Sequence, residues 1–167
     1  MPRFELRAPS IDQAHLILGF IKELAEYEQL SHECLITEES LQDSLFRDEP
    51  HAESLIAFLD EKPIGFCLYF FNYSTFLGKP GLYLEDLYIQ PDYRNNGYGK
   101  RILARLASIA LERGCGRFEW AVLDWNEPSI AFYRKLGAEP MIDWTVQRLT
   151  GQALEDLSRF SKSNDDV

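Results

Sequence analysis

Apolar residues recur every three to four positions in four stretches of the chain, a spacing typical of helices with one buried face. Start and stop signals flank these stretches, among them Ser10 with Gln13, which has the pattern of a capping box. The predicted helices run from Ser10 to about Tyr27, from Thr37 onward, from the loop 91–100 to Gly114, and from an Asn126 cap to Gly137.

Six shorter stretches alternate in polarity or consist mainly of apolar and aromatic residues, and they predict strands. They are residues 4–7, 54–59, 64–71, 82–89, 117–123 and 144–149. The turn at 60–63 predicts that the second and third strands form a hairpin, and a weak helix is predicted from Gly151 onward. This order predicts an α/β fold, α+β in some schemes, with one mixed central sheet flanked by helices.

The length of 167 residues favours one domain, expected over residues 1–160, with a polar C-terminal tail over 161–167. No apolar run approaches the ~20 residues that span a bilayer, and the start of the chain lacks a secretory signal, so no membrane partner is expected. The three cysteines form no CxxC pair and the three histidines are scattered. We therefore expect no metal and a reducing, cytoplasmic location.

The net charge of −10 is unevenly distributed along the chain. Residues 1–60 contain 13 acidic and 4 basic side chains, whereas residues 94–117 contain 6 basic side chains and a single acidic one. A nucleic-acid binder would show a broader basic patch, so no nucleic-acid partner is expected. The distribution suits a protein that receives one anionic and one cationic small molecule, although an acidic surface also serves solubility alone.

A turn-rich loop joins the predicted strand 82–89 to the following helix and contains Arg94-x-x-Gly97-x-Gly99. Glycines permit close approach of a ligand to the backbone, and the N–H groups at a helix start attract anions. The pattern is not a dinucleotide-binding fingerprint, because its third glycine position falls on Ile102, and no Gly-Lys-Ser/Thr of a Walker loop follows. Two glycines alone would also fit a simple turn.

The strand, the Arg-x-x-Gly-x-Gly loop and the helix together resemble the acetyl-CoA-binding motif of the GNAT acetyltransferase superfamily. The stretches 22–28, 83–86 and 125–133 resemble the diamine (spermidine/spermine or thialysine) acetyltransferase branch, and the resemblance covers roughly residues 4–149. It implies a strongly twisted mixed sheet, splayed where the pantetheine of acetyl-CoA pairs with backbone. It also implies acetyl transfer from CoA to an amine, usually by a homodimer.

The resemblance also implies which residues bind acetyl-CoA. The pantetheine would pair with the backbone of Leu87, Tyr88 and Ile89, whose side chains are free to pack in the core. The pyrophosphate would lie on Asn95, Asn96, Gly97, Tyr98, Gly99 and Lys100, with added charge from Arg94 and Lys100. Asn126 and Ser129 are further candidates, although a helix cap alone would explain both.

Two catalytic residues follow from the resemblance, Tyr133 as the acid that protonates the leaving thiolate and Glu85 as a substrate ligand and water-relayed base. An ammonium with a pKa of about 10.4 is only about 0.04% neutral at pH 7, so the amine needs a proton acceptor. Glu85 and Asp86 are adjacent on a strand and would face opposite ways unless a bulge intervenes. A core tyrosine and an exposed edge acid are the alternatives.

The substrate side of the site has less specific candidates. The resemblance implies that Tyr27 and Glu28 help to bind a cationic chain, and Asp86, Glu119, Trp120 and Trp144 add acids and aromatic faces suited to an ammonium. Large aromatics on strands are often core residues instead. The segment between Gly137 and Trp144 is shorter than in polyamine enzymes, which leaves open whether Asp143 binds substrate and whether the amine is a polyamine or a lysine-like amino acid.

The sequence thus predicts an acetyl-CoA-dependent N-acetyltransferase of a small primary amine. A protein-lysine or N-terminal acetyltransferase is an alternative that would favour an open peptide groove. A non-catalytic CoA-binding dimer is another, disfavoured because binding alone requires neither Tyr133 nor Glu85.

Overall fold

The computed structural model describes residues 2–161 and divides into two compact units, the first ending at Ala121 and the second beginning at Val122. Each unit is described by itself. No helix among the described residues combines the length and the apolar character needed to cross a bilayer.

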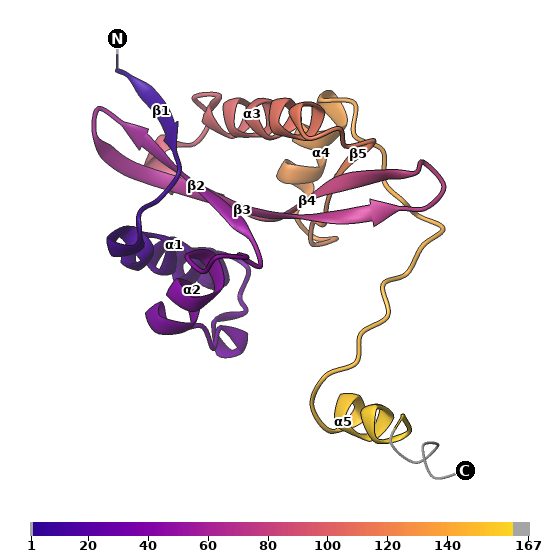
Figure 1. Cartoon of the computed structure of the whole chain (residues 1–167). Coiled ribbons are helices and arrows are strands. Elements are labelled where there is room, and N and C mark those ends of the chain that lie inside the picture. Colours follow the sequence, from indigo (N-terminus) through magenta and orange to yellow (C-terminus); the bar gives the residue numbers. More distant parts are fainter. Residues whose placement is uncertain (1, 162–167) are drawn as a thin grey trace. The chain divides into compact units, whose positions relative to one another are not determined.

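The first unit is built on a five-stranded mixed sheet whose strands follow one another in chain order (Figure 1). The strands are β1 (Phe4–Arg7), β2 (Glu53–Leu59), β3 (Lys62–Ser74), β4 (Lys79–Ile89) and β5 (Arg117–Trp120). Neighbours are antiparallel from β1 to β4, and β5 is parallel to β4. The predicted mixed sheet is therefore confirmed, although the strand predicted over 117–123 already ends at Trp120.

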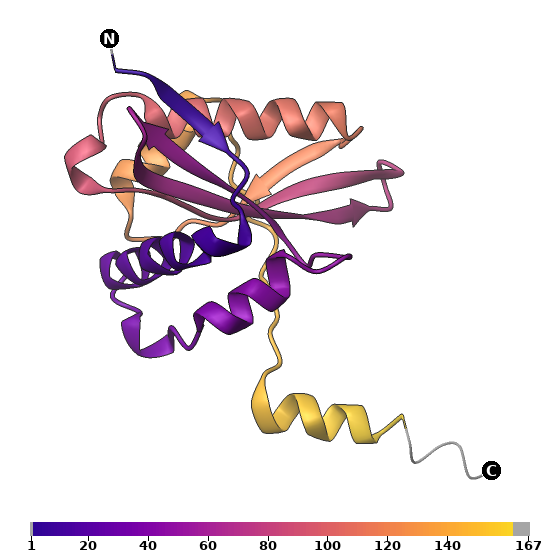
Figure 2. The ribbon, with the colours of Figure 1, turned by 60° about the vertical axis from the view of Figure 1, so that its left-hand side comes forward.

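Helices cover both faces of this sheet. Figures 1 and 2 show α1 (Ala14–Tyr27) and α2 (Glu38–Leu45) on one face and α3 (Tyr98–Glu112) on the other. Short 3-10 turns lie at Ile11–Gln13, Ser31–Glu33 and Pro91–Tyr93. The three predicted helices of this part of the chain are confirmed, because each presents an apolar face that the sheet buries.

The core forms where α1 meets the middle of the sheet. Ile17 and Ile56 are fully buried, and the rings of Phe20 and Phe66 stack with their centroids 6.0 Å apart. On the other face, α3 buries the residues that share its apolar stripe, namely Ile102, Leu103, Leu106, Ile109 and Ala110. The apolar residues that recur at helical spacing in the sequence are therefore the ones that α1 and α3 bury against the sheet.

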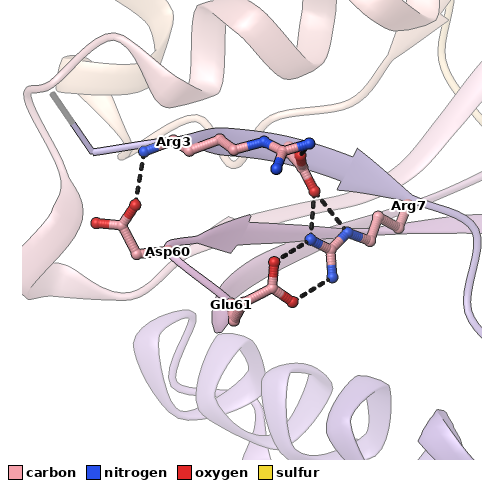
Figure 3. Close-up of polar contacts among 5 residues, drawn as sticks. Arg3, Arg7, Asp60 and Glu61 are labelled. Carbon is pink, nitrogen blue, oxygen red and sulfur yellow. Dashed lines mark hydrogen bonds and ion pairs between the residues drawn. The ribbon is translucent and has the colours of Figure 1, made fainter.

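The predicted hairpin is also present, and an ionic cluster fastens β1 to its turn (Figure 3). Asp60 and Glu61 adopt positive φ values of 47° and 66°, as the two central residues of a tight hairpin turn do. The Arg7 guanidinium donates to Glu61 at 2.8 and 2.6 Å, and the backbone N–H of Arg3 donates to Asp60 Oδ1 at 2.7 Å. These exposed pairs secure an edge strand that is only four residues long.

The second unit contains α4 (Glu127–Lys135) and α5 (Gly151–Arg159). The strand predicted over 144–149 is wrong: this segment has no regular secondary structure, and Trp144 is 76% exposed. Alternating polarity gives a segment two faces, but a strand also needs a neighbour for its backbone groups, and residues 2–161 supply none here. Most of the predicted tail, 162–167, lies outside the described residues.

Candidate active site

The sheet opens between β4 and β5 close to the middle of β4. The two strands pair from Gly81–Arg117 to Leu84–Trp120, and beyond that point β4 continues to Ile89 paired only with β3 among the described strands. The backbone of Leu87, Tyr88 and Ile89 therefore has one edge without a neighbouring strand within residues 2–161. This is the splay that the sequence led us to expect, at the residues expected to meet pantetheine.

A β-bulge lies at the start of this opening. Leu84 is opposite Tyr69 and Asp86 is opposite Leu68, which leaves Glu85 as an extra residue on β4. Because a bulge interrupts strict alternation, the side chains of Glu85 and Asp86 need not point to opposite faces of the sheet. Glu85 is exposed, whereas Asp86 is partly buried.

Two carboxyl groups, Glu85 and Glu28, act on that of Asp86 beside the bulge. Burial, followed by the negative charges of Glu85 and Glu28, raises the pKa of Asp86 to about 6. Burial also raises the pKa of Glu28, the C-cap residue that follows α1. The structure thus brings together three of the predicted substrate-binding residues from two elements, and a cation bound among them would relieve their mutual repulsion.

The predicted phosphate loop leads directly into α3. Gly97 is the N-cap with φ of +80°, and Arg101 is the first residue to donate back, to the Gly97 carbonyl at 3.1 Å. The N–H groups of Tyr98, Gly99 and Lys100 consequently have no acceptor inside the helix. A Cβ built on Gly97 or Gly99 would meet nothing within 4 Å, so this face of the loop is open to a ligand. Open space and backbone donors at one helix start suit a pyrophosphate.

Two side chains of the loop bind backbone. The Asn96 amide donates to the carbonyls of Tyr93 and Arg94 at 3.2 and 2.9 Å, and the exposed Asn95 has a positive φ of 63°. Arg94 donates through Nε to the Ile89 carbonyl at 2.8 Å, and its guanidinium carbon lies 4.8 Å from the ring centroid of Tyr27. The structure therefore places the Arg94 guanidinium beside α1 and β4, and leaves the exposed Lys100 as the side-chain charge of the loop.

The two candidates on β5 lie just before the opening. Glu119 is opposite Tyr83 and Trp120 is opposite Leu84. Glu119 forms an ion pair with Arg117 at 2.8 Å, and together with Glu85 it raises the pKa of Tyr83, after the larger effect of burial. Trp120 packs against Phe118 with ring centroids 4.9 Å apart. Both candidates are partly buried, so each combines structural contacts with access to solvent.

The remaining candidates belong to the second unit. The buried Asn126 accepts the N–H of Ser129 at 3.4 Å, which confirms the predicted helix cap. Tyr133 is partly buried in the second turn of α4, and its ring centroid is 5.5 Å from that of Phe132. Trp144 lies in the irregular segment described above, and Asp143 precedes it in an exposed turn.

Sequence reasoning missed two long-range contacts beside the site. The Gln90 side chain donates a hydrogen bond to Glu23 at 3.1 Å. The pKa of the buried Tyr88 is raised mainly by burial and also by Glu23. Phe4 stacks on Tyr98, the first residue of α3, with centroids 4.8 Å apart. Their members are far apart in the chain, and no local pattern signals such a pair.

Comparison with known proteins assigns the family. The model of the acetyltransferase (GNAT) family matches residues 21–138. The chain is 39% identical over 153 residues to a thialysine N-epsilon-acetyltransferase of Sus scrofa, covering 85% of this chain and 89% of that protein. It is 43% identical over 97 residues to an L-ornithine N5-acetyltransferase of Arabidopsis thaliana, covering 58% of this chain and 42% of that protein.

A solved structure shares the fold. An aminoglycoside N-acetyltransferase in complex with CoA superposes with a TM-score of 0.70 at 20% identity, covering 91% of this chain and 97% of that one. The family match spans the β4 opening, the loop before α3 and the whole of α4. The chain belongs to the acetyltransferase (GNAT) family and is an N-acetyltransferase that uses acetyl-CoA.

Proposed function

We propose that this enzyme acetylates the side-chain amine of a small, cationic, lysine-like amino acid, with diamines as weaker substrates. The observation that carries the proposal is the group of three carboxyls, Glu28, Glu85 and Asp86, at the bulge where β4 leaves β5. The relatives named for thialysine and ornithine act, by their names, on amino acids that end in an ammonium group. An acidic site beside an open strand edge suits such an ammonium.

In this proposal Glu85 removes the proton from the ammonium through a water molecule, while Asp86 and Glu28 bind the cation. Glu85 is the exposed member of the bulge and therefore reaches solvent, whereas Asp86 is partly buried. Glu119, Trp120, Tyr27 and Trp144 are proposed as further neighbours of the substrate. The aromatic faces among them favour a cation.

Acetyl-CoA binding is assigned to the backbone of Leu87, Tyr88 and Ile89 and to the loop 95–100. Acetyl-CoA supplies the acetyl group as a thioester. The support is the strand edge without a neighbour and the three N–H groups at the start of α3, with Lys100 as the nearby cation and Arg94 beneath the loop. Asn126 and Ser129 are proposed to contact the cofactor in addition to capping α4.

Tyr133 is proposed as the acid that protonates the departing CoA thiolate. A phenol with a pKa near 10 is neutral at pH 7 and can donate to a thiolate. The Asn126 cap and the turns of α4 fix the position of Tyr133 on its helix, and the side chain is only partly buried. A tyrosine at a defined position on a capped helix suits this role.

We further propose that the two units act as one N-acetyltransferase domain over residues 1–160 and that the enzyme is a cytoplasmic homodimer. Large apolar side chains of the second unit are exposed, including Trp144, Val146, Leu154 and Phe160, and a second copy of the chain would cover such surface. The three cysteines are free thiols, as is usual in a reducing compartment. The proposal includes no nucleic-acid and no membrane partner.

Thiol release from acetyl-CoA with a panel of amines tests the function. The panel contains thialysine, lysine, ornithine, spermidine, putrescine and a histone peptide. We expect the highest kcat/KM for thialysine or ornithine. A preference for the peptide would replace the proposal by protein-lysine acetylation. CoA binding without thiol release from any amine would indicate a non-catalytic CoA-binding dimer.

A further inference from the structure

Arg94 is the first residue of the proposed phosphate-binding loop, and its side chain packs against α1 and β4. Its guanidinium carbon lies over two tyrosine rings, 4.8 Å from the centroid of Tyr27 on α1 and 5.3 Å from that of Tyr88 on β4. Its Nε–H donates to the carbonyl of Ile89 at 2.8 Å. A single side chain at the entrance of the loop thus contacts both α1 and the end of β4.

Each of these contacts lies beside a different part of the proposed site. Tyr27 is the last residue of α1 and directly precedes Glu28, one of the three carboxyls. Ile89 ends the strand edge assigned to pantetheine. Arg94 itself is followed by Asn95 and Gly97, whose positive φ values of 63° and 80° shape the loop that opens α3.

We propose that Arg94 is a positioning residue that couples acetyl-CoA binding to amine binding, an inference that rests on the proposed function. Acetyl-CoA bound to the loop and to the end of β4 would hold both segments in place, and Arg94 with them. Its cation–π contact then fixes Tyr27, and with it the backbone that carries Glu28. Cofactor binding therefore organises the amine site before the amine arrives, and amine binding in turn tightens the cofactor.

The chemistry of the side chain explains why arginine suits this role. A guanidinium is planar, so it can lie against aromatic rings while Nε–H donates in the same plane to a carbonyl. A lysine ammonium can approach a ring but cannot reproduce that combination. Arg94→Lys should therefore lose the coupling between acetyl-CoA binding and amine binding, although it keeps the positive charge.

The experiment measures the linkage between the two ligands. The dissociation constant of thialysine is determined by calorimetry with and without saturating CoA, for the wild type, Arg94→Gln and Arg94→Lys. We expect CoA to tighten thialysine binding at least fivefold in the wild type. The factor should fall below twofold in both variants. Arg113→Gln is the matched control, because Arg113 lies over the Phe71 ring at 5.3 Å and is not part of the proposed site. It should keep the wild-type factor.

A second variant protects the test against simple unfolding. Tyr27→Leu keeps Arg94 but removes one ring, and we expect it to reduce the linkage as well. The double variant with Arg94→Gln should lose no more linkage than Arg94→Gln alone. The inference is overturned if the wild type binds both ligands without linkage, or if Arg94→Gln keeps the wild-type factor. A wild type that binds CoA but none of the amines would instead overturn the proposed function, and this inference with it.

Discussion

Replacing Gly99 by glutamate should make the fold more stable while it strongly weakens acetyl-CoA binding. Gly99 lies in the first turn of α3, and a Cβ there meets no atom within 4 Å. Its backbone is not in the positive-φ region, in contrast to Gly97, where any side chain is strained. A substitution at position 99 can therefore separate cofactor binding from folding, whereas one at position 97 cannot.

The substitution should raise stability and lower cofactor affinity for the same reason. The N-terminus of α3 attracts negative charge, so the new carboxylate stabilises the helix but repels the phosphate that would bind there. Replacing a helical glycine gains about 0.5–1 kcal/mol. A carboxylate in the first turn adds about 0.3–1 kcal/mol through the helix dipole. At roughly 5 Å and an effective dielectric constant of about 20, the same carboxylate repels one phosphate charge by about 3 kcal/mol. That repulsion weakens binding on the order of 100-fold.

Thermal unfolding and CoA calorimetry measure the two effects separately. The melting temperature of Gly99→Glu should rise by about 2–8 °C, given about 2–4 °C per kcal/mol for a chain of this size. Gly99→Gln is the control, since it has nearly the same size without the charge. Its affinity for CoA should exceed that of Gly99→Glu by at least tenfold, and the gap should narrow at high salt. Equal CoA affinities for the two variants would refute the placement of the pyrophosphate.

Three further predictions concern one proposed substrate-binding residue, Asp86, and the two proposed catalytic residues, Glu85 and Tyr133. The raised pKa of Asp86, about 6, means that its carboxyl binds the proton more tightly in the folded state than in the unfolded state, so Asp86 contributes a fall in the free energy of unfolding as the pH rises from about 4 to about 6. Asp86→Asn should remove this fall and be more stable than the wild type at pH 7.5 in urea denaturation; an unchanged pH profile would contradict it. Glu85→Gln should show a rate defect that fades between pH 7 and pH 10, as the amine loses its proton unaided, and a constant defect would leave Glu85 a positioning role only. Tyr133→Phe should lower kcat by roughly 10²–10³-fold with CoA affinity nearly unchanged, whereas wild-type turnover would exclude the phenol as the acid.

Much of the fold and part of the site could be predicted because their signals are local. The apolar spacing of α1 and α3 corresponds to the buried faces of these helices, and Asn126 caps α4 as expected. The positive φ at Gly97 is likewise a property of one residue and its neighbours. Such features depend on contacts within a turn or two of helix, which the order of residues specifies directly.

The sequence by itself therefore determined the helices, the hairpin and the loop that opens α3. The tertiary structure decided which strands pair, in which register they pair, and which carboxyl groups have a shifted pKa. The alternation over 144–149 predicts a strand, but only a neighbouring strand could have formed one. The bulge at Glu85 depends on how β3 and β4 align over their whole length. The raised pKa of Asp86 on β4 comes mainly from burial, then from Glu85 and from Glu28, and Glu28 lies at the end of α1. The position of Arg94 in its motif predicts a phosphate ligand, yet its side chain contacts Tyr27, which lies 67 residues earlier in the chain. These properties arise from groups that only folding brings together, so no local pattern specifies them.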